Sequence, residues 1–422
     1  MFFMNGTNKK KIVNDPVHGF ISFSHPLIFD LIEHPYFQRL RNIKQLGLTY
    51  LVYPGATHSR FQHCIGAMHL LDLAIDTLRS KGLDITEQEA EAAAVAILLH
   101  DIGHGPFSHA LEHVIANHIS HEYLSRCYLY QLNKEFNGKL SLAIDIFEDK
   151  YPRHFLHQLI SGQLDMDRMD YLKRDSFYTG VSEGIIGTER IIKMLNVVND
   201  TLVVEAKGIY SIEKFLIARR LMYWQVYLHK TVVAAEQVLI KMLERAKELA
   251  SDGEDIYCNE PLLFLLRSKL SKPDFLPDDG NPEPPIPLQY FAMIDDNDIM
   301  VAAKQWMHHP DQVLSQLAGM IVNRRLPGVE LKNSNFDSSR LQDLRVSFSK
   351  EYPHLAENSH YFVFTDSISI NAYRPGEEAI QILYNNGQLV DIAIASDMLN
   401  ARALSDESKK FFLCYPKQLR SV

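Results

Sequence analysis

The segment His100-Asp101-Ile102-Gly103-His104 follows an alanine-rich run of good helix formers and constrains the fold of this chain more than any other feature. Thr86 and Glu89 have the spacing of a capping box, so we expect a helix to begin at residue 87 and to end near residue 99. Gly103 and the pair Gly105-Pro106 prevent regular continuation of that helix. The sequence therefore predicts an imidazole and a carboxylate held together at a helix end.

The composition is that of an ordinary globular protein. With 422 residues, 46% of them hydrophobic and 23% charged, the chain is long enough for roughly two or three domains. No segment reaches the roughly 18 apolar residues that cross a bilayer, and residues 1–11 lack the hydrophobic region of a signal peptide. We therefore expect a cytoplasmic protein without a membrane segment.

The cysteines and the net charge disfavour several classes of protein. Cys64, Cys127, Cys258 and Cys414 show no CxxC spacing, so reduced thiols are expected rather than a disulfide framework or a zinc ribbon. A net charge of −9 gives no general attraction to nucleic acid, which disfavours such a partner without excluding it. A polyanionic substrate would need a local cluster of Arg, Lys and metal.

The spacing of apolar residues predicts a mainly α fold. Helical spacing dominates residues 26–250, with helices expected at about 60–80 and 211–250. Six prolines within residues 272–287 indicate a linker. β-branched and aromatic residues at 361–370, and at 379–394 around Asn385-Asn386-Gly387, predict strands. We expect a helical core with its N-terminal segment over residues 1–271, then the linker, and a smaller α+β region over residues 288–422.

Histidine is concentrated in one part of the chain. Nine of the 19 histidines lie between residues 58 and 121: His58, His63, His69, His100, His104, His109, His113, His118 and His121. Acidic neighbours favour a metal site, because mixed nitrogen and oxygen ligands suit Mn, Fe, Co or Zn, while Mg prefers more oxygen. Asp165, Asp167 and Asp170 each offer a further carboxylate, and spacing alone does not select one of the three.

Five sequence strings occur in a fixed order along the chain. They are NDPVHG (14–19), FQRLR (37–41), PGATHSRFQH (54–63), HDIGHGPFSH (100–109) and DMDRMDY (165–171). Together they resemble the HD-superfamily deoxynucleoside triphosphate triphosphohydrolases, most closely the branch that includes the vertebrate SAM-and-HD-domain enzyme and its bacterial relatives. The resemblance covers residues 11–230 with gaps, and it implies an HD-domain helical core.

The resemblance implies a metal site and a set of catalytic residues beside it. The implied metal ligands are His63, His100, Asp101 and Asp167. Two neutral imidazoles and two carboxylates leave a divalent ion near neutrality, with positions open to water and a phosphate oxygen. The implied catalytic residues are His104, His109, His121 and Glu112, with His109 as acid or orienter, His121 as its partner, and Glu112 where the relatives carry Asp. Histidine suits proton transfer because its pKa lies near neutrality.

The resemblance also implies which residues contact the substrate. Arg60, Arg168 and Arg219 would contact its phosphates, since a guanidinium suits bidentate contacts to phosphate. The residues expected around the sugar and base are Gln45, Leu46, Tyr171, Asp175 and Tyr227. A tight wall there would exclude a 2′-hydroxyl, because a buried hydroxyl without a partner is costly. Leu228 replaces a polar residue of the vertebrate relative, so the preferred base stays open.

In nucleotide-activated members of this family, an activating nucleotide binds at a subunit interface. The matching residues here are Lys11, Glu33, Gln38, Arg41, Arg190 and Lys207, where Glu33 replaces an aspartate. The resemblance therefore implies a homo-oligomer and a regulatory nucleotide site.

The leading hypothesis is a metal-dependent hydrolase that converts a dNTP and water into a deoxynucleoside and triphosphate. One alternative keeps the HD chemistry but acts on another phosphoester, such as a nucleoside monophosphate, a cyclic nucleotide or an oligonucleotide. A second alternative is a non-catalytic, nucleotide-binding regulatory protein.

Overall fold

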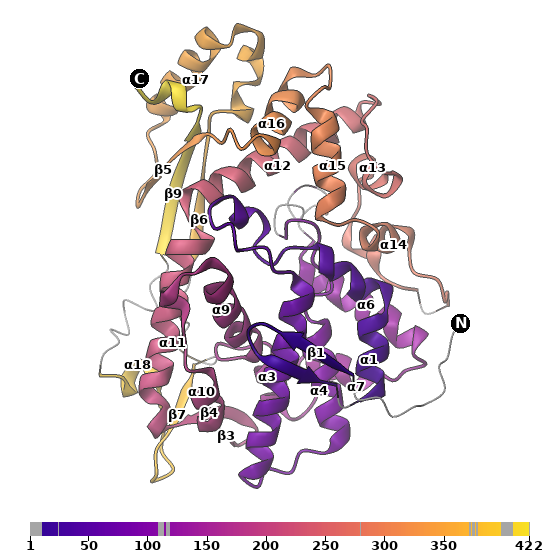
Figure 1. Ribbon diagram of the computed structural model, residues 1–422, viewed down its shortest axis with the longest axis vertical. Coiled ribbons are helices and arrows are strands. Elements are labelled where there is room, and N and C mark those ends of the chain that lie inside the picture. The colour runs from indigo at the N-terminus through magenta and orange to yellow at the C-terminus, as the bar shows by residue number, and fades with distance from the viewer. Residues whose placement is uncertain are drawn as a thin grey trace.

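The computed structural model describes residues 11–23, 25–108, 114, 119–278, 280–370, 373, 376, 379–397 and 408–421. Helices dominate this part of the chain, together with three small β-sheets (Figure 1). None of these helices is long and apolar enough to span a bilayer. The prediction of a mainly α fold with a smaller α+β C-terminal region is confirmed.

The helices and strands have the following bounds. The helices are α1 (Pro26–Glu33), α2 (Pro35–Gln38), α3 (Arg60–Ser80), α4 (Glu87–Leu99), α6 (His121–Glu135), α7 (Ser141–Phe147), α8 (His154–Ile160), α9 (Met166–Thr179), α10 (Thr188–Met194), α11 (Ile209–Met222), α12 (Lys230–Ser251), α13 (Glu260–Arg267), α14 (Ile286–Ala292), α15 (Asp296–Trp306), α16 (Gln312–Val322), α17 (Ser338–Glu351) and α18 (Ile392–Ala395). The strands are β1 (Ile12–Asp15), β2 (Gly19–Ser22), β3 (Leu195–Val198), β4 (Thr201–Glu205), β5 (Gly328–Lys332), β6 (Phe364–Ile370), β7 (Gln381–Leu383), β8 (Leu389–Asp391) and β9 (Ser408–Tyr415).

Helices α3 and α4 lie at the centre of the helical core. Both begin at capping boxes, Ser59 with Gln62 for α3 and Thr86 with Glu89 for α4. Residues 92–99 of α4 are all buried, and its alanines let neighbouring helices approach closely. Helix α3 packs against both α4 and α9.

Helix α9 begins and ends at residues suited to those positions. The Asp165 side chain accepts a hydrogen bond from the Arg168 backbone N–H at 2.7 Å, which satisfies a free donor of the first turn. The helix ends at Gly180, whose φ of 74° is left-handed. The first turn of α9 is thereby fixed beside α3.

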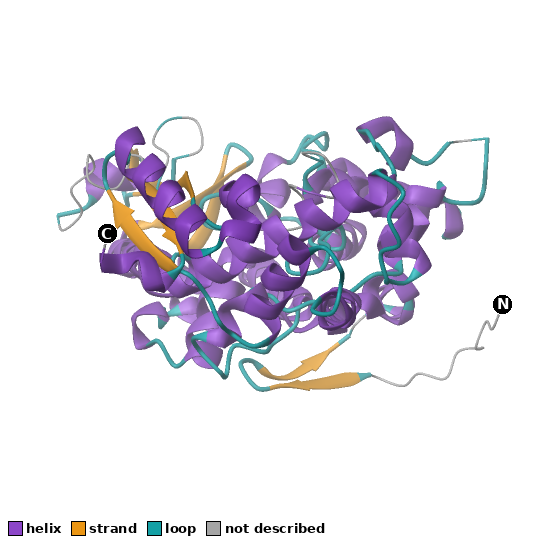
Figure 2. Cartoon of the chain, turned by 90° about the horizontal axis from the view of Figure 1, so that it is seen from above, coloured by secondary structure: helices purple, strands orange, loops and turns teal. Residues whose placement is uncertain are grey.

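The strands form three sheets in the described part of the chain. The β1–β2 hairpin lies on the outside of the helices (Figure 2). The second sheet has the order β3-β4-β7-β8, in which β4 and β7 are parallel and the other neighbours antiparallel. The third has the order β5-β9-β6. One continuous hydrophobic core extends from the N-terminal helices to the C-terminal strands.

One sequence expectation differs from the structure. The single helix expected at residues 211–250 is wrong, because a π-helical turn at Tyr223–Tyr227 separates α11 from α12. Within residues 272–287, Phe275 is buried and α14 begins at Ile286. The division of the chain into domains at this segment stays a prediction.

Candidate metal centre

The turn after α4 is fixed by a residue of α6. The Ser125 hydroxyl accepts a hydrogen bond from the Gly103 N–H at 2.9 Å and donates one to the His100 carbonyl at 2.7 Å. A Cβ atom on Gly103 would lie 2.2 Å from the carbonyl oxygen of His121. Glycine is therefore required where the chain leaves α4, and the turn holds His100 and Asp101 against α6.

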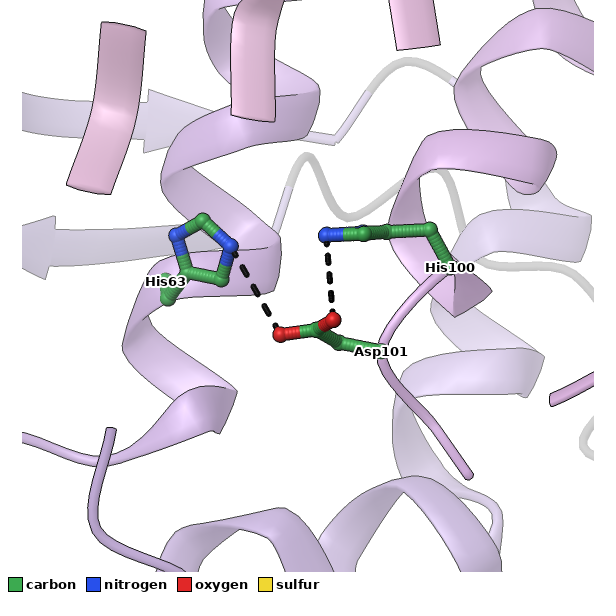
Figure 3. Close-up of side chains that lie close together, drawn as sticks. All are labelled: His63, His100 and Asp101. Carbon is green, nitrogen blue, oxygen red and sulfur yellow. Dashed lines mark ion pairs between the residues drawn. The ribbon is translucent and has the colours of Figure 1, made fainter. Parts of the chain in front are cut away.

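Three helices bring four predicted residues together. Nε2 of His63, from α3, lies 3.0 Å from Oδ1 of Asp167, from α9, and 3.8 Å from Oδ2 of Asp101. Nε2 of His100, at the end of α4, lies 3.4 Å from Oδ1 of Asp101 and 3.5 Å from Oδ1 of Asp167. Figure 3 shows both imidazoles pointing toward Asp101. We call these four residues the HD cluster, and three of them, His63, His100 and Asp101, are close enough to share one metal ion.

The two imidazoles of the HD cluster are oriented as metal ligands are. Nδ1 of His63 lies 2.8 Å from Oδ2 of Asp170, and Nδ1 of His100 lies 2.6 Å from the Ile97 carbonyl oxygen. Each Nε2 atom is buried and faces the carboxylates of Asp101 and Asp167. A ring nitrogen that faces a metal needs no other partner, while the second nitrogen is held by the protein. The residues present therefore fit a divalent cation.

The carboxylates of the HD cluster are ionised. Burial alone would raise the pKa of Asp101, but His100, Arg60 and His104 hold it well below its usual range. The pKa of Asp167 is lowered in the same way, against the effect of burial, by His100 and His63. The site thus offers a cation two negative charges, on the buried Asp101 and the half-buried Asp167, which suits a divalent ion.

The pKa values of the two histidines nearest to Asp101 and Asp167, His63 and His104, are shifted in opposite directions. Burial opposes the charged form of His63, but its contacts with Asp167 and Asp170 raise its pKa to about 10, so a metal ion at Nε2 would displace a proton. Burial and the neighbouring Arg60 lower the pKa of His104 well below its usual value. His104 is therefore neutral near pH 7.

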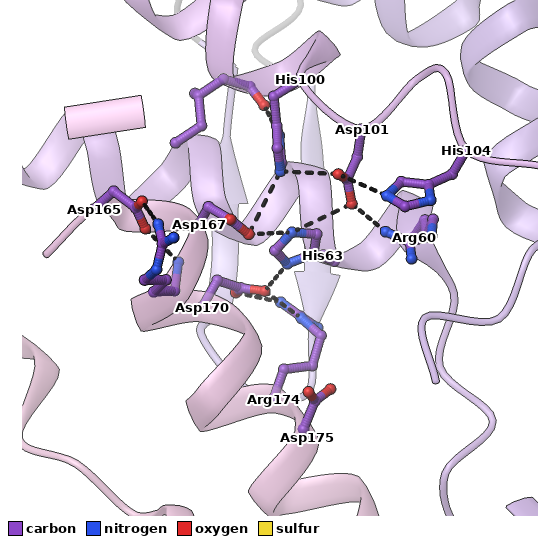
Figure 4. A network of polar contacts seen from close by, with 12 residues as sticks. Arg60, His63, His100, Asp101, His104, Asp165, Asp167, Asp170, Arg174 and Asp175 are labelled. Atoms are coloured by element: carbon purple, nitrogen blue, oxygen red, sulfur yellow. Dashed lines mark hydrogen bonds and ion pairs between the residues drawn. The ribbon is translucent and has the colours of Figure 1, made fainter. Parts of the chain in front are cut away.

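The structure separates the three aspartates that the sequence left open (Figure 4). Asp165 caps α9 and accepts a hydrogen bond from the Gly162 N–H at 2.8 Å, while its carboxylate pairs with the Arg168 side chain. Asp170 lies behind His63 and contacts its Nδ1 atom. Only Asp167 among these three approaches Nε2 of His63. Its assignment as a metal ligand stays a prediction.

Two of the predicted phosphate-binding arginines are engaged with acidic residues. Arg60 forms a buried ion pair with Asp101 and donates to the Ser108 hydroxyl, at 3.1 Å from Nε and 2.6 Å from Nη2. Ser108 has a left-handed φ of 54°, which is costly for a residue other than glycine. Arg168 is paired with Asp165 rather than directed at the HD cluster. Arg60 therefore positions Asp101. A phosphate bound by Arg60 would have to share its guanidinium group with Asp101.

The other predicted catalytic residues lie partly within the described chain. The imidazole rings of His104 and His121 stack with centroids 3.8 Å apart, and Nε2 of His104 lies 3.3 Å from Oδ1 of Asp101. His109 and Glu112 lie outside the described residues. The structure thus brings His104 and His121 next to the HD cluster.

Predicted sugar-binding residues form a second polar group. Asp175 accepts a hydrogen bond from the Tyr227 hydroxyl at 2.7 Å, and its other oxygen lies 2.7 Å from Nε2 of His58. The rings of Tyr171 and Tyr227 have centroids 6.2 Å apart, and the Gln45 N–H donates to the His58 carbonyl at 3.0 Å. His58 was assigned no role from the sequence, although it lies in the histidine-rich segment. Contact with a sugar stays a prediction for this group.

Two further predicted substrate residues lie in separate surroundings. Arg219 is buried in the last turn of α11, with its guanidinium 5.9 Å from the Tyr223 ring centroid. Leu46 is half-buried and packs against the hydrophobic core. Their roles toward a substrate stay predictions.

The predicted regulatory residues fall into two groups. The Arg41 Nε atom donates to Gln38 at 2.8 Å, and its guanidinium lies 3.6 Å from the Phe61 ring centroid. Arg190 donates to the Lys207 carbonyl at 3.1 Å. Arg41 also borders a cavity of about 260 Å³, whose other lining residues are Val13, Asn14, Asp15, Ser59, Phe61, Gln62 and Ile65. Binding of a nucleotide by these residues stays a prediction.

Lys11 and Glu33, the remaining predicted regulatory residues, are exposed. Glu33 is the last residue of α1.

The fold and this cluster define an HD-domain protein. The HD-domain family profile matches residues 60–175, and the profile of the HD-associated region matches residues 186–261. The chain belongs to the HD phosphohydrolase family. It is 33% identical to the uncharacterised protein YwfO of Bacillus subtilis over 99% of this chain and 95% of that protein.

Solved and curated relatives extend this picture. A crystal structure of a phosphohydrolase from Bacteroides thetaiotaomicron is 52% identical, has a TM-score of 0.91, and is matched over 97% of this chain and 100% of that chain. The deoxynucleoside triphosphate triphosphohydrolase SAMHD1 homolog of Dictyostelium discoideum is 32% identical over 58% of this chain. This chain spans only 51% of that protein's length.

Proposed function

We propose that this chain is a metal-dependent dNTP triphosphohydrolase that releases a deoxynucleoside and inorganic triphosphate. The observation that carries the proposal is the HD cluster, in which two buried Nε2 atoms and two ionised carboxylates converge from three helices. Relatives named as dNTP triphosphohydrolases, from Dictyostelium discoideum at 32% identity and Danio rerio at 34%, support the substrate class.

The proposed chemistry is attack of water on the α-phosphorus with loss of the 5′-oxygen. A divalent cation held by the HD cluster, whether Mn, Fe, Co, Zn or Mg, would act as a Lewis acid and lower the pKa of water. Arg60 keeps the Asp101 carboxylate in place and offers positive charge to the α-phosphate. The leaving 5′-oxygen needs a proton, and His109, with His121 as its partner, is proposed to supply it.

The proposed sugar site is the group around Asp175. Its carboxylate, which Tyr227 and His58 hold in place, would accept a hydrogen bond from the 3′-hydroxyl of the sugar. Tyr171 would pack against the 2′-carbon. A 2′-hydroxyl pressed against that ring would lose its hydrogen bonds to water, which disfavours ribonucleotides. Homo-oligomerisation and activation by a second nucleotide, at the site that includes Arg41, belong to the same proposal.

Product analysis tests the proposal directly. Each dNTP and NTP is supplied singly and in pairs, with Mn or Mg, and triphosphate and nucleoside are separated by anion-exchange chromatography. We expect triphosphate from at least one dNTP and none from the NTPs. Stimulation of one dNTP's hydrolysis by another would support the regulatory site, whereas equal hydrolysis of every dNTP alone would argue against it.

Two variants connect the activity to the HD cluster. Asp101→Asn and Asp167→Asn should each abolish hydrolysis and lower the metal content, while Asp165→Asn should keep its metal because Asp165 caps α9. Orthophosphate as the only direct product would favour another phosphoester as substrate. A metal-loaded protein that hydrolyses no nucleotide in the panel would favour the non-catalytic alternative.

A further inference from the structure

The buried carboxylate of Asp170 holds several side chains together behind the HD cluster (Figure 4). Its Oδ2 atom lies 2.8 Å from Nδ1 of His63 and accepts a hydrogen bond from Nε of Arg174 at 2.8 Å. Its Oδ1 atom lies 2.7 Å from Nε2 of His18 and accepts from Nη2 of Arg174 at 3.0 Å. Asp170 and Arg174 have no exposed surface. Both oxygens of Asp170 are therefore fixed, and so is the direction in which it meets His63.

The outer part of this network belongs to the turn of the β1–β2 hairpin. Asp15 accepts a hydrogen bond from Nη1 of Arg174 at 2.7 Å through its Oδ2 atom. Its Oδ1 atom accepts from the backbone N–H groups of Val17 and His18, both at 2.9 Å. Asp15 thus shapes the turn that presents His18 and also anchors Arg174. The string at residues 14–19 therefore has a structural role, because it supplies both Asp15 and His18 to this network.

Helix α3 leaves space for this network at one residue. A Cβ atom on Gly66 would lie 2.1 Å from Oδ1 of Asp170 and 2.2 Å from Nη2 of Arg174. Glycine in a helix interior is otherwise unfavourable relative to alanine. Its presence one turn after His63 therefore matches the need to admit the Asp170–Arg174 pair against α3.

The charges of the network act on His63. Asp15, Arg174 and Asp170 together carry one net negative charge, which is buried next to Nδ1 of His63. The ion pair with Arg174 keeps the Asp170 side chain as a carboxylate acceptor toward His63. An ionised partner at one ring nitrogen fixes the tautomer and increases the basicity of the other nitrogen.

We propose that Asp15, His18 and Arg174 are positioning residues of the metal centre, which act through Asp170 to orient the His63 imidazole. The N-terminal hairpin is then part of the active site, although none of its residues belongs to the HD cluster. This inference rests on the proposed role of His63 as a metal ligand.

The first test removes and restores the contact of His18. Wild type, His18→Ala and His18→Gln are compared by circular dichroism, by titration with Mn²⁺ monitored by electron paramagnetic resonance, and by kcat and KM for the dNTP with the highest activity. We expect His18→Ala to bind Mn²⁺ about 10- to 100-fold more weakly. It should lose kcat with little change in KM at limiting Mn²⁺. His18→Gln keeps a side-chain N–H donor and should recover most of the affinity.

The second test alters the network from α3. Gly66→Ala should weaken Mn²⁺ binding and lower the melting temperature, because the methyl group displaces Asp170 or Arg174. Gly319→Ala is the matched control, since Gly319 also lies within a helix but its added Cβ would have no neighbour closer than 4.0 Å. We expect this control to bind Mn²⁺ as wild type does.

The outcomes separate the two proposals. Folded His18→Ala and Gly66→Ala proteins that bind Mn²⁺ as tightly as wild type, with unchanged kcat, would overturn the positioning role and leave the metal centre intact. Equal loss in His18→Ala and His18→Gln would also overturn it, because the hydrogen bond would then not matter. A wild-type protein that binds no divalent metal would overturn the proposed function and this inference together.

Discussion

The Asp296 carboxylate accepts a hydrogen bond from the backbone N–H of Phe107 at 2.8 Å. Its other oxygen accepts from the backbone N–H of Lys44 at 3.0 Å. Phe107 has a left-handed φ of 51° and precedes Ser108, the partner of Arg60. The first residue of α15 therefore holds a strained loop that supports the HD cluster from the C-terminal side of the predicted linker.

Asp296→Ala should destabilise the protein by about 1–3 kcal/mol, because it leaves buried N–H groups without acceptors. Activity should fall further than stability alone explains, since the loop positions Arg60. Thermal melting and steady-state kinetics below the melting temperature measure the two effects. Asn297→Ala, at the exposed neighbouring residue, is the control and should match wild type. Equal activity in both variants would contradict the role of this contact.

Removal of the metal should lower thermal stability as well as activity. A ligand present at 100 times its dissociation constant stabilises the folded state by about 2.7 kcal/mol. Chelation should therefore lower the melting temperature of wild type by several degrees, and added Mn²⁺ should restore it. Asp167→Asn should show no such response to chelator. A response in that variant equal to wild type would remove Asp167 from the ligand set.

Gly103→Ala should disturb the turn after α4. Its methyl group would overlap the His121 carbonyl and the Ser125 N–H, so α6 or the turn must shift, at a cost of about 1–3 kcal/mol. Denaturant unfolding measures this loss, and activity should fall with it because His100 moves. Gly280→Ala has room for its methyl group and serves as the control. Wild-type stability in Gly103→Ala would contradict the close packing described.

The hydrogen bonds of Glu89, a residue far from the HD cluster, predict that the stability of the protein depends on pH. Burial would raise its pKa, but hydrogen bonds from the Thr86 backbone and from the Arg153 side chain lower it below the usual value. A carboxyl group with a depressed folded-state pKa stabilises the protein above its unfolded pKa, and this stabilisation is lost as the pH falls through the folded-state pKa. Glu89→Gln should cost about 1–2 kcal/mol at pH 7.

The difference between wild type and Glu89→Gln should shrink as the pH falls below the unfolded-state pKa of a glutamate, about 4.3, and through the lower folded-state pKa of Glu89. Melting temperatures of both proteins from pH 3 to pH 7 would show this convergence. A constant difference across that range would mean that the ionised form of Glu89 has no special role.

Local signals in the sequence predicted several elements correctly. The capping box of Thr86 and Glu89 begins α4, and Asn385-Asn386-Gly387 lies in the turn between β7 and β8. These features depend on a few neighbouring residues, which the sequence displays directly. The π-helical turn at Tyr223–Tyr227 was not predicted, because its residues fit an α-helical pattern and the Tyr227 contact with Asp175 is distant in sequence.

In the candidate site, too, contacts between residues distant in sequence could not be predicted. In the sequence, the three aspartates of residues 165–170 are equivalent carboxylates. In the fold, Asp165 caps α9, Asp167 faces the HD cluster, and Asp170 lies behind His63. His18 lies 152 positions from Asp170, so no spacing rule could connect them. Such contacts depend on the packing of separate elements, which periodicity does not encode.

The parallel pairing of β4 with β7 has a consequence for synthesis of the chain. Residues 203–205 cannot find their partners at 381–383 until most of the polypeptide has left the ribosome. Until then, one edge of β4 exposes unpaired N–H and C=O groups that another chain could bind. A fragment that stops at residue 271 would keep this edge open permanently. The open edge of β4 is therefore one reason for such a fragment to aggregate, in addition to the part of the hydrophobic core that it would expose.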